Sequence, residues 1–442
     1  AGGRGAGGLG GGGGRVIAAL IAILTMTVIG IPIALAVDRA ARGPLLIGLA
    51  FLYGSGWIFL DLLIVPHWTV VLATIVALLP LLLLRLPFKT PDPGPGRRDR
   101  LKPHWLDIPT LVSIAGFGFF TTGAALWEWD FWAIWGMKAR VFLEHGGIDW
   151  RFLESRWNTF VHPDYPLLVP FNFDFVALLN GGWSDRWLGL LSLAWAAALL
   201  LIVRDLAARE SAPVAAALVT LTVTGLAASR YPGLAEGPLI AFGAAGVLFT
   251  RRAILFDDSV AWRHGALLLG LAANTKNEGL ALLVSVAIAL SVVRRRDVLR
   301  LWPSALLAAP WLILRAMHVL PTDIVGNSAT SRVLARLPHA GEILMFLARR
   351  LYEPWFWIAL LAGLIIVPGT IVFRERFVLI VTAVQLAFYI ASYFATPHEV
   401  AWHVLTSWSR LTDQIAIPIT VVVFLGLANF AATAASRSPT SS

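Results

Sequence analysis

The chain contains no cysteine and few charged residues. None of its 442 residues is Cys, and 14% are Asp, Glu, Lys or Arg, against about 25% in an ordinary soluble domain. The missing cysteine excludes disulfides, a thiol nucleophile and a thiolate metal site. The low charge content, together with a mean hydropathy of +0.75, excludes an ordinary soluble domain.

Long apolar runs dominate the sequence. Runs of about 17–25 residues recur, and each is long enough to cross a hydrocarbon core of roughly 30 Å. Examples are residues 16–37, 44–65, 68–86 and 415–432. These runs do not alternate with a period of two, which favours helices over barrel strands. The sequence therefore predicts an all-α polytopic membrane protein with about 12 transmembrane helices.

The excess of positive charge predicts orientation. The net charge of +9 does not indicate a nucleic-acid partner, because no basic stripe or basic domain carries it. Lys and Arg instead collect in cytoplasmic loops of membrane proteins. The Arg- and Pro-rich residues 87–107 are the strongest cytoplasmic marker. We therefore expect a multi-pass protein of the cytoplasmic (inner) membrane, with residues 127–165 forming a large extracytoplasmic loop.

This orientation divides the chain into five parts. Residues 1–15 are a Gly-rich tail expected to be disordered, residues 16–86 hold N-terminal helices, and residues 87–107 are the cytoplasmic linker. Residues 108–434 form the main transmembrane module, and residues 435–442 a cytoplasmic tail. Within the module, the alternation of inside and outside turns that the charges predict places both ends of residues 166–182 outside. That pattern predicts an interfacial or re-entrant segment, with an ordinary span as the alternative.

A polar, aromatic-rich stretch opens the predicted outer loop. It reads WEWDFWAIWGMKARVFLEHGGIDW over residues 127–150. In a helix, Asp130 and Lys138 would lie two turns apart and within about 80° of one face. A carboxylate beside Trp side chains and a cation can be tuned to act as a general base. Asp130 is therefore a candidate base and Lys138 a candidate substrate contact, and Glu128 could converge on the same point. The alternative is an interfacial belt of Trp residues with incidental charge.

Further polar turns fall on the same predicted side. The segment HPDYPLL places His162, Asp164 and Tyr165 where they could contact a phosphate or a sugar. His162 and Asp164 could also ligate a divalent metal together with Glu128 or Asp130, although the spacing matches no established metal motif. No cofactor is otherwise indicated.

Two later turns add cations and a carboxylate. RYPGLAEGP contributes Arg230, Tyr231 and Glu236, and TKNEG contributes Lys276, Asn277 and Glu278. Lys and Arg at the headgroup level suit a lipid phosphate or pyrophosphate. The structural alternative is an ion pair of Lys276 with Glu278 or Glu236.

The segment before the last apolar run carries a helical pattern. Glu399, His403 and Arg410 follow one another at spacings of four and seven residues, which aligns them on one helical face. An amphipathic surface helix would explain this pattern. Our preferred interpretation is that Arg410 contacts an anion.

These pieces, in this order, resemble the GT-C-type integral-membrane glycosyltransferases, the superfamily of protein O-mannosyltransferases and bacterial aminoarabinose transferases. The resemblance covers residues 127–414. It rests on Asp130 at the start of the first large outer loop, the GGIDW turn, HPDYPLL, the Tyr231/Glu236/Pro238 turn and the Lys-bearing TKNEG. Uncharacterised bacterial members share a terminal motif, which here comprises Trp402, His403, Ser407, Arg410, Leu411 and Gln414. Phe131 departs from the family, which often has a second acid at that position; Glu128 or Glu236 is the candidate substitute.

The resemblance implies a GT-C-like fold and a reaction. A sugar would pass from a polyprenyl-phosphate-linked donor to an acceptor glycan, lipid or protein at the outer face of a bacterial membrane, with inversion and with Asp130 as general base. Candidate catalytic residues are Asp130, Glu128 and Glu236. Candidate substrate-binding residues are Lys138, His162, Asp164, Tyr165, Arg230, Tyr231, Lys276, Asn277, Glu278, His403 and Arg410. The alternative function is a polytopic lipid or sugar transporter or flippase, for which no internal repeat is evident.

Overall fold

Helices account for every regular element in the part of the chain that the computed structural model describes, residues 12–70, 72–74, 103–228, 232–322, 327–351 and 356–437. Several predicted segments lie outside the described residues: residues 1–11 of the Gly-rich tail, most of the 68–86 run, most of the linker 87–107, the candidates Arg230 and Tyr231, and the last five residues. Residues 12–15, which the sequence placed in the disordered tail, instead form the start of α1. The α-helices are α1 (Gly12–Val37), α2 (Gly43–Ile64), α5 (Asp107–Gly123), α6 (Gly136–His145), α7 (Trp150–Glu154), α8 (Leu168–Leu179), α9 (Gly189–Glu210), α10 (Pro213–Ala228), α11 (Glu236–Phe256), α12 (Ser259–Ala272), α13 (Asn277–Val293), α14 (Trp302–Met317), α15 (Asn327–Arg336), α16 (Ala340–Ala348), α17 (Phe356–Ile366), α18 (Arg376–Ala395) and α19 (Val400–Arg437). Short 3₁₀ or π turns are η1 (His67–Thr69), η2 (Phe131–Trp135), η3 (Arg156–Val161), η4 (Arg295–Leu301), η5 (Leu337–His339) and η6 (Thr370–Arg374).

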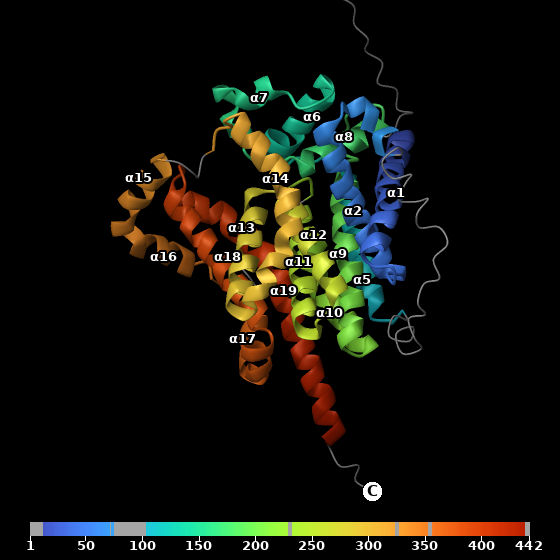
Figure 1. The fold of residues 1–442 in the computed structure, drawn as a ribbon, viewed down its shortest axis with the longest axis vertical. Helices are drawn as coiled ribbons and strands as arrows, with labels where there is room; N and C mark the ends of the chain where they lie inside the picture. The colour runs from blue at the N-terminus through green and yellow to red at the C-terminus, as the bar shows by residue number, and fades with distance from the viewer. Residues whose placement is uncertain are drawn as a thin grey trace, which may run out of the picture.

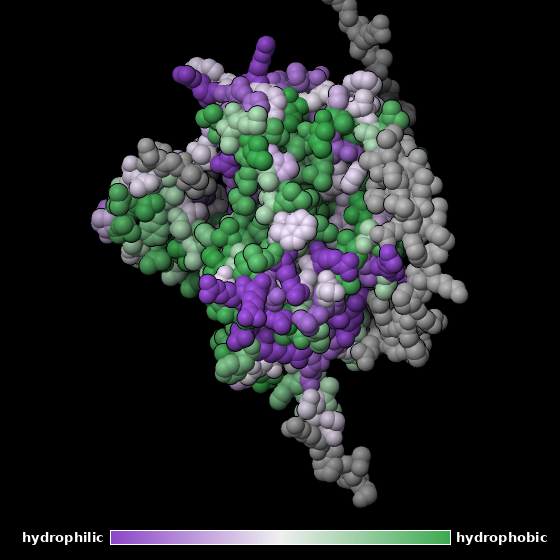
Figure 2. Space-filling view, in the orientation of Figure 1, coloured by the Kyte–Doolittle hydropathy of each residue, from purple (hydrophilic) through white to green (hydrophobic). Residues whose placement is uncertain are grey.

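The described chain has the helices of a multi-pass membrane protein. Seven are long and apolar enough to cross a bilayer, namely Arg15–Val37, Gly43–Ile64, Gly189–Glu210, Glu236–Phe256, Arg295–Met317, Arg376–Ala395 and Val400–Ser436. Four shorter apolar helices accompany them. In Figure 2 a largely hydrophobic surface lies between hydrophilic residues at the top of the molecule and a hydrophilic band in its lower part. The prediction of an all-helical membrane protein is confirmed at this level.

Figure 1 shows how the helices are arranged around the long axis. The helices α6 and α7 and the end of α14 lie at one end, and α17 and the last turns of α19 lie at the other. We call these the loop end and the tail end. The pair α15 and α16 lies beside the bundle, next to the end of α18.

Glycine allows α1 and α2 to pack backbone against backbone. A Cβ atom on Gly30 would lie 1.7 Å from the carbonyl oxygen of Ala50, and one on Gly54 would lie 1.7 Å from that of Met26. Small residues at helix crossings permit this close approach in membranes, where van der Waals contact replaces the hydrophobic effect between helices.

The segment that contains α8 enters the bundle and leaves it on the same side. Its 12 residues span roughly 18 Å, which is too short for a hydrocarbon core of roughly 30 Å. At its start Leu168 N–H donates to the carbonyl of Asn274, and beyond its end the carbonyl of Asp185 accepts from Leu126 N–H. Asn274 precedes α13 and Leu126 follows α5, and both lie near the loop end. This geometry agrees with the re-entrant interpretation of residues 166–182.

Candidate functional site

A cavity of about 320 Å³ lies where the polar turns of the loop end meet. Its wall comes from six places in the chain: the start of η2, the HPDYP segment, the first residue of α11, the turn before α13, the last turns of α18 and the first turns of α19. The lining residues are Asp130, Ile134, Trp135, His162, Tyr165, Glu236, Lys276, Asn277, Glu278, Ala281, Phe388, Tyr389, Ser392, Thr396, Pro397, His398, Trp402, His403, Thr406, Ser407, Arg410 and Leu411. Nine of the sequence-based candidates are among them.

One buried carboxylate organises the charges of this wall. Glu236 is 0% exposed, and its Oε1 lies 3.1 Å from Lys276 Nζ and 2.6 Å from Arg410 Nη2. The same guanidinium nitrogen also forms an ion pair with Asp130. Glu236 therefore holds two cations that are 134 residues apart in the sequence, and it places one of them against the candidate base.

Lys276 has a second carboxylate partner. Its Nζ lies 2.8 Å from Glu278 Oε1, so both ion pairs that the sequence allowed are present. Burial lowers the pKa of Lys276, but the carboxylates of Glu236 and Glu278 raise it by more, so the pKa lies above its usual value. The lysine is therefore a fixed positive charge at the cavity.

Backbone geometry at the turn before α13 depends on Gly279. A Cβ atom there would lie 1.9 Å from the carbonyl oxygen of Ala272. The helix α12 ends at Ala272, Lys276 is extended, and α13 begins at Asn277. The close approach of Gly279 to the end of α12 brings the Lys276 turn back toward Glu236.

Asp130 stands at the start of a π turn. Phe131 and Trp135 in η2 are 1% exposed and anchor the turn, whereas Trp129 and Trp132 are mostly exposed and stack with ring centroids 6.2 Å apart. π-Helical turns are rare and often occur at functional sites. This turn directs the carboxylate of Asp130 into the cavity.

Glu128 lies outside the cavity. It does not contribute to the wall, and its carbonyl oxygen accepts a hydrogen bond from Trp132 N–H at 3.1 Å. Glu128 and Glu236 were the two candidates for a second acid, and of these Glu236 lines the cavity.

Lys138 lies behind the cavity wall. It is 0% exposed, its Nζ donates to the carbonyl of His162 at 3.0 Å, and it lies 5.1 Å from the ring of Trp135. Burial lowers its pKa to about 7, against the opposing effect of Asp164. The direct substrate contact that the sequence suggested for Lys138 is not what the structure shows; the side chain supports the wall instead.

The carbonyl that accepts the Lys138 hydrogen bond belongs to a residue with a strained backbone. His162 has φ 49°, in the left-handed region that side chains with a Cβ rarely adopt. Its ring stacks on Tyr165 with centroids 4.7 Å apart, and Tyr165 stacks on Trp135. The bond from Lys138 thus holds the carbonyl of a backbone conformation that is otherwise unfavourable.

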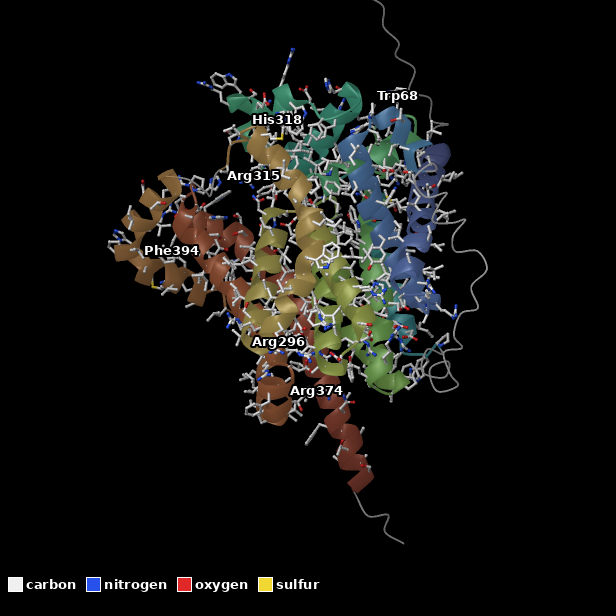
Figure 3. All side chains as sticks on the ribbon, in the orientation of Figure 1. Trp68, Arg296, Arg315, His318, Arg374 and Phe394 are labelled. Carbon is white, nitrogen blue, oxygen red and sulfur yellow. The ribbon has the colours of Figure 1, made fainter. Side chains whose placement is uncertain are left out.

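Asp164 also acts as a brace. It is 2% exposed, its Oδ2 accepts from Asn277 Nδ2 at 2.9 Å, and Arg315 Nη2 lies 3.5 Å away. Trp311 Nε1 donates to its carbonyl at 3.3 Å. Figure 3 shows Arg315 on the part of α14 that reaches the loop end. Arg315 did not figure among the candidates, although a lone arginine in an apolar helix is a signal of function or pairing.

The C-terminal motif contributes a polar face of α19. His403, Ser407 and Arg410 line the cavity, and Ser407 Oγ lies 2.9 Å from Tyr393 Oη. Glu399 does not share this face, because its carboxylate caps the start of α19 by accepting from two backbone N–H groups.

The last turns of α18 and the turn that follows form a part of the wall that the candidates did not include. Tyr389 and Ser392 lie in α18, Thr396 and His398 lie between α18 and α19, and all four line the cavity. A polar stripe at helical spacing within an otherwise apolar span is the signal that could have identified them.

No three His, Asp or Glu side chains of the described chain come together as metal ligands. Asn277 and Arg315 both contact Oδ2 of Asp164. A divalent metal at this site finds no ligand set in the described wall.

No protein-family model, no curated protein and no solved structure matches this chain.

Proposed function

We propose that the chain is an integral-membrane glycosyltransferase that moves a sugar from a polyprenyl-phosphate-linked donor to an acceptor hydroxyl. The observation that carries the proposal is the wall formed by Asp130, Arg410, Glu236 and Lys276. It combines a carboxylate that can accept a proton with two cations that can hold a phosphate, beside aromatic rings that can stack on a sugar face.

The proposed reaction is a single displacement at the anomeric carbon. Asp130 takes the proton of the acceptor hydroxyl while the acceptor oxygen bonds to the anomeric carbon. The bond from that carbon to the phosphate oxygen breaks, and its electron pair leaves with the lipid phosphate. Lys276 and Arg410 would stabilise the negative charge that develops there, which is often the largest catalytic contribution.

Arg410 couples donor binding to the base. In the structure its guanidinium is shared between Asp130 and Glu236. A phosphate that competes for Arg410 would weaken the ion pair with Asp130 and free that carboxylate to accept a proton. Glu236 would keep Arg410 in place during this exchange, so its role is positioning.

The proposed topology places this cavity outside the cytoplasm. About 12 crossings, with the Arg-rich turns in the cytoplasm, would put the loop end at the outer face of the inner membrane. The convergence of the loop-end turns on one cavity supports this arrangement, as does the return of α8 to the side from which it enters.

The test is release of free lipid phosphate by purified protein in vesicles supplied with polyprenyl-phosphate sugar and an acceptor mixture. Asp130→Asn is expected to reduce release by at least about 100-fold, whereas Glu144→Gln is the matched control. Glu144 is an exposed carboxylate on α6 that pairs with Arg140 and does not line the cavity. Equal turnover in the Asp130→Asn and Glu144→Gln proteins would remove Asp130 from the mechanism.

A transporter or flippase is the second candidate, and one buried pair favours it. His67 Nδ1 lies 3.3 Å from Asp174 Oδ2, with the two side chains 1% and 0% exposed. Buried ionisable pairs among membrane helices often serve proton relays. The same assay separates the two functions, because a transporter would move the lipid-linked sugar across the vesicle membrane without producing free lipid phosphate.

A further inference from the structure

A second cavity, of about 540 Å³, lies at the tail end. It is bounded by the turn between α17 and α18, by the last third of α19 and by Arg251 near the end of α11. The lining residues are Arg251, Thr370, Arg374, Glu375, Leu425, Gly426, Asn429, Phe430, Thr433 and Ala434. In Figure 3, Arg374 and Arg296 mark this end, and Arg315 and His318 mark the loop end.

The floor of this cavity is a closed ion network. Arg251 is 4% exposed, and its guanidinium donates to both oxygens of Glu375 at 2.6 and 2.7 Å and to both oxygens of Glu210 at 2.8 and 2.9 Å. These bonds join α9 and α11 to the residue that precedes α18. Arg251 and the two glutamates carry one positive and two negative charges, and the nearby guanidinium groups of Arg374 and Arg252 offset the difference.

Arg374 is different, because its donors remain open. Its side chain is 43% exposed, and its nearest carboxylate contacts are 3.5 Å to Glu375 and 3.8 Å to Glu210, beyond hydrogen-bond distance for a well-placed guanidinium. Its side chain makes no hydrogen bond to another described residue. Arg374 ends the π turn η6, which fixes its backbone at the rim of the cavity.

The opposite wall combines polar and apolar groups. Asn429 and Thr433 lie one turn apart on α19 and line the cavity. Phe430 lines it as well and is 53% exposed, and Phe373 in η6 is 76% exposed. The cavity is thus lined by the amide of Asn429 and by Thr433, whose hydroxyl donates to the carbonyl of Asn429 at 2.9 Å, and large exposed apolar side chains accompany them.

We propose that this cavity binds the headgroup of an anionic phospholipid from the leaflet at the tail end. The phosphodiester would lie against Arg374 and the side chains of Asn429 and Thr433, and the acyl chains would pass over Phe430 and Phe373. Basic pockets between membrane helices are suited to such headgroups, and an arginine with open donors gives charge-assisted bonds to phosphate. The exposed phenylalanines favour a lipid over a soluble phosphate compound.

Native mass spectrometry of the delipidated full chain in detergent tests this site. The protein is titrated with phosphatidylglycerol or with phosphatidylcholine of the same acyl chains. The wild type is expected to bind phosphatidylglycerol more tightly, and Arg374→Gln to weaken that binding about tenfold. Arg296→Gln is the matched control, since Arg296 is an exposed arginine at the same end that does not line the cavity.

Two further measurements keep the result decisive. Asn429→Leu leaves the ion network intact and is expected to weaken phosphatidylglycerol binding as well, which guards against a folding defect in the arginine variant. Glycerol phosphate is expected not to displace the lipid at equal concentration. Equal loss in the Arg374→Gln and Arg296→Gln proteins, equal binding of the two lipids, or displacement by glycerol phosphate would each overturn the proposal. None of these results depends on sugar transfer.

Discussion

Replacing Glu236 by Gln tests the central ionic arrangement of the loop end. The substitution keeps the shape of the side chain and removes its charge. Lys276 and Arg410 would then each lose a carboxylate at 3.1 and 2.6 Å. Lys276 would retain Glu278, and Arg410 would retain Asp130. The two cations would therefore be undercompensated but not isolated.

The size of the effect follows from this partial compensation. At an effective dielectric constant of about 20, a unit charge pair about 3 Å apart is worth about 5 kcal/mol. Removing one partner of a buried ion pair typically costs about 3–5 kcal/mol. Because the remaining carboxylates compensate in part, we expect a loss near the lower end, about 3 kcal/mol. The melting temperature in detergent should fall by roughly 6 °C.

The assay is thermal unfolding of purified protein, followed by a double-mutant comparison. Glu278→Gln is the matched control, since Glu278 is 20% exposed and Lys276 would keep Glu236; its expected loss is about 1 kcal/mol. Glu236→Gln combined with Lys276→Met should lose less stability than the sum of the single changes, by at least about 1 kcal/mol. Equal losses for the two glutamate variants, or simple additivity in the double variant, would refute the idea that Glu236 holds the two cations.

Three further outcomes are expected. Glu128→Gln should leave lipid-phosphate release within about twofold of wild type, because its carboxylate does not reach the cavity. Burial lowers the pKa of Lys138 to about 7 in the folded protein, so between pH 7 and about 10 the unfolded chain binds more protons than the folded one. The free energy of unfolding should therefore rise with pH in this range, by at most about 1.4 kcal/mol per pH unit. Lys138→Met should remove this rise. Gly279→Ala should displace α13 from the end of α12 and destabilise the fold by about 2 kcal/mol or more, because its Cβ atom would collide with Ala272.

Each of these outcomes has a direct check. Loss of release in Glu128→Gln would restore Glu128 as a second acid. Denaturation at pH 7 and pH 9 compares the wild type with Lys138→Met, and parallel pH profiles would contradict the buried-lysine argument. For Gly279→Ala the comparison is Gly116→Ala, where an added Cβ atom meets nothing within 4 Å; equal stability of the two variants would contradict the close approach.

The sequence predicted those features that are written in local pattern. Apolar runs predicted membrane helices, because each run must satisfy its own backbone hydrogen bonds within the bilayer. Charge parity predicted the unusual path of residues 166–182. The GGIDW turn carries local signals as well: Gly146 ends α6 in the left-handed conformation, and the carboxylate of Asp149 caps α7.

Ion pairs between residues that are far apart in the sequence could not be predicted from local pattern. Glu236 and Arg410 are 174 residues apart, and the sequence around either residue does not predict that the other is its ion-pair partner. Lys138 illustrates the same limit. Regular helical spacing predicted that Lys138 and Asp130 share a helix face. The π turn η2 between them changes the angle between the two side chains around the helix axis, and the segment that contains His162 covers the lysine. Burial of a lysine depends on which segment packs over it, which is a property of the tertiary structure.

The ionic clusters at the two ends of α11 differ, and the difference favours the loop-end cluster as the site of the proposed reaction. Glu236 begins this helix and Arg251 lies 15 residues later, roughly 22 Å along the axis. At the first position a buried carboxylate holds two cations, which also pair with Glu278 and Asp130 at the cavity wall. An anionic leaving group that reached Lys276 and Arg410 there would be stabilised. At the second position a buried guanidinium holds two carboxylates, and the inner group is net negative until Arg374 and Arg252 balance it. The first arrangement places the candidate base, Asp130, on a cation that an incoming phosphate could take over, and this exchange is what the proposed reaction requires.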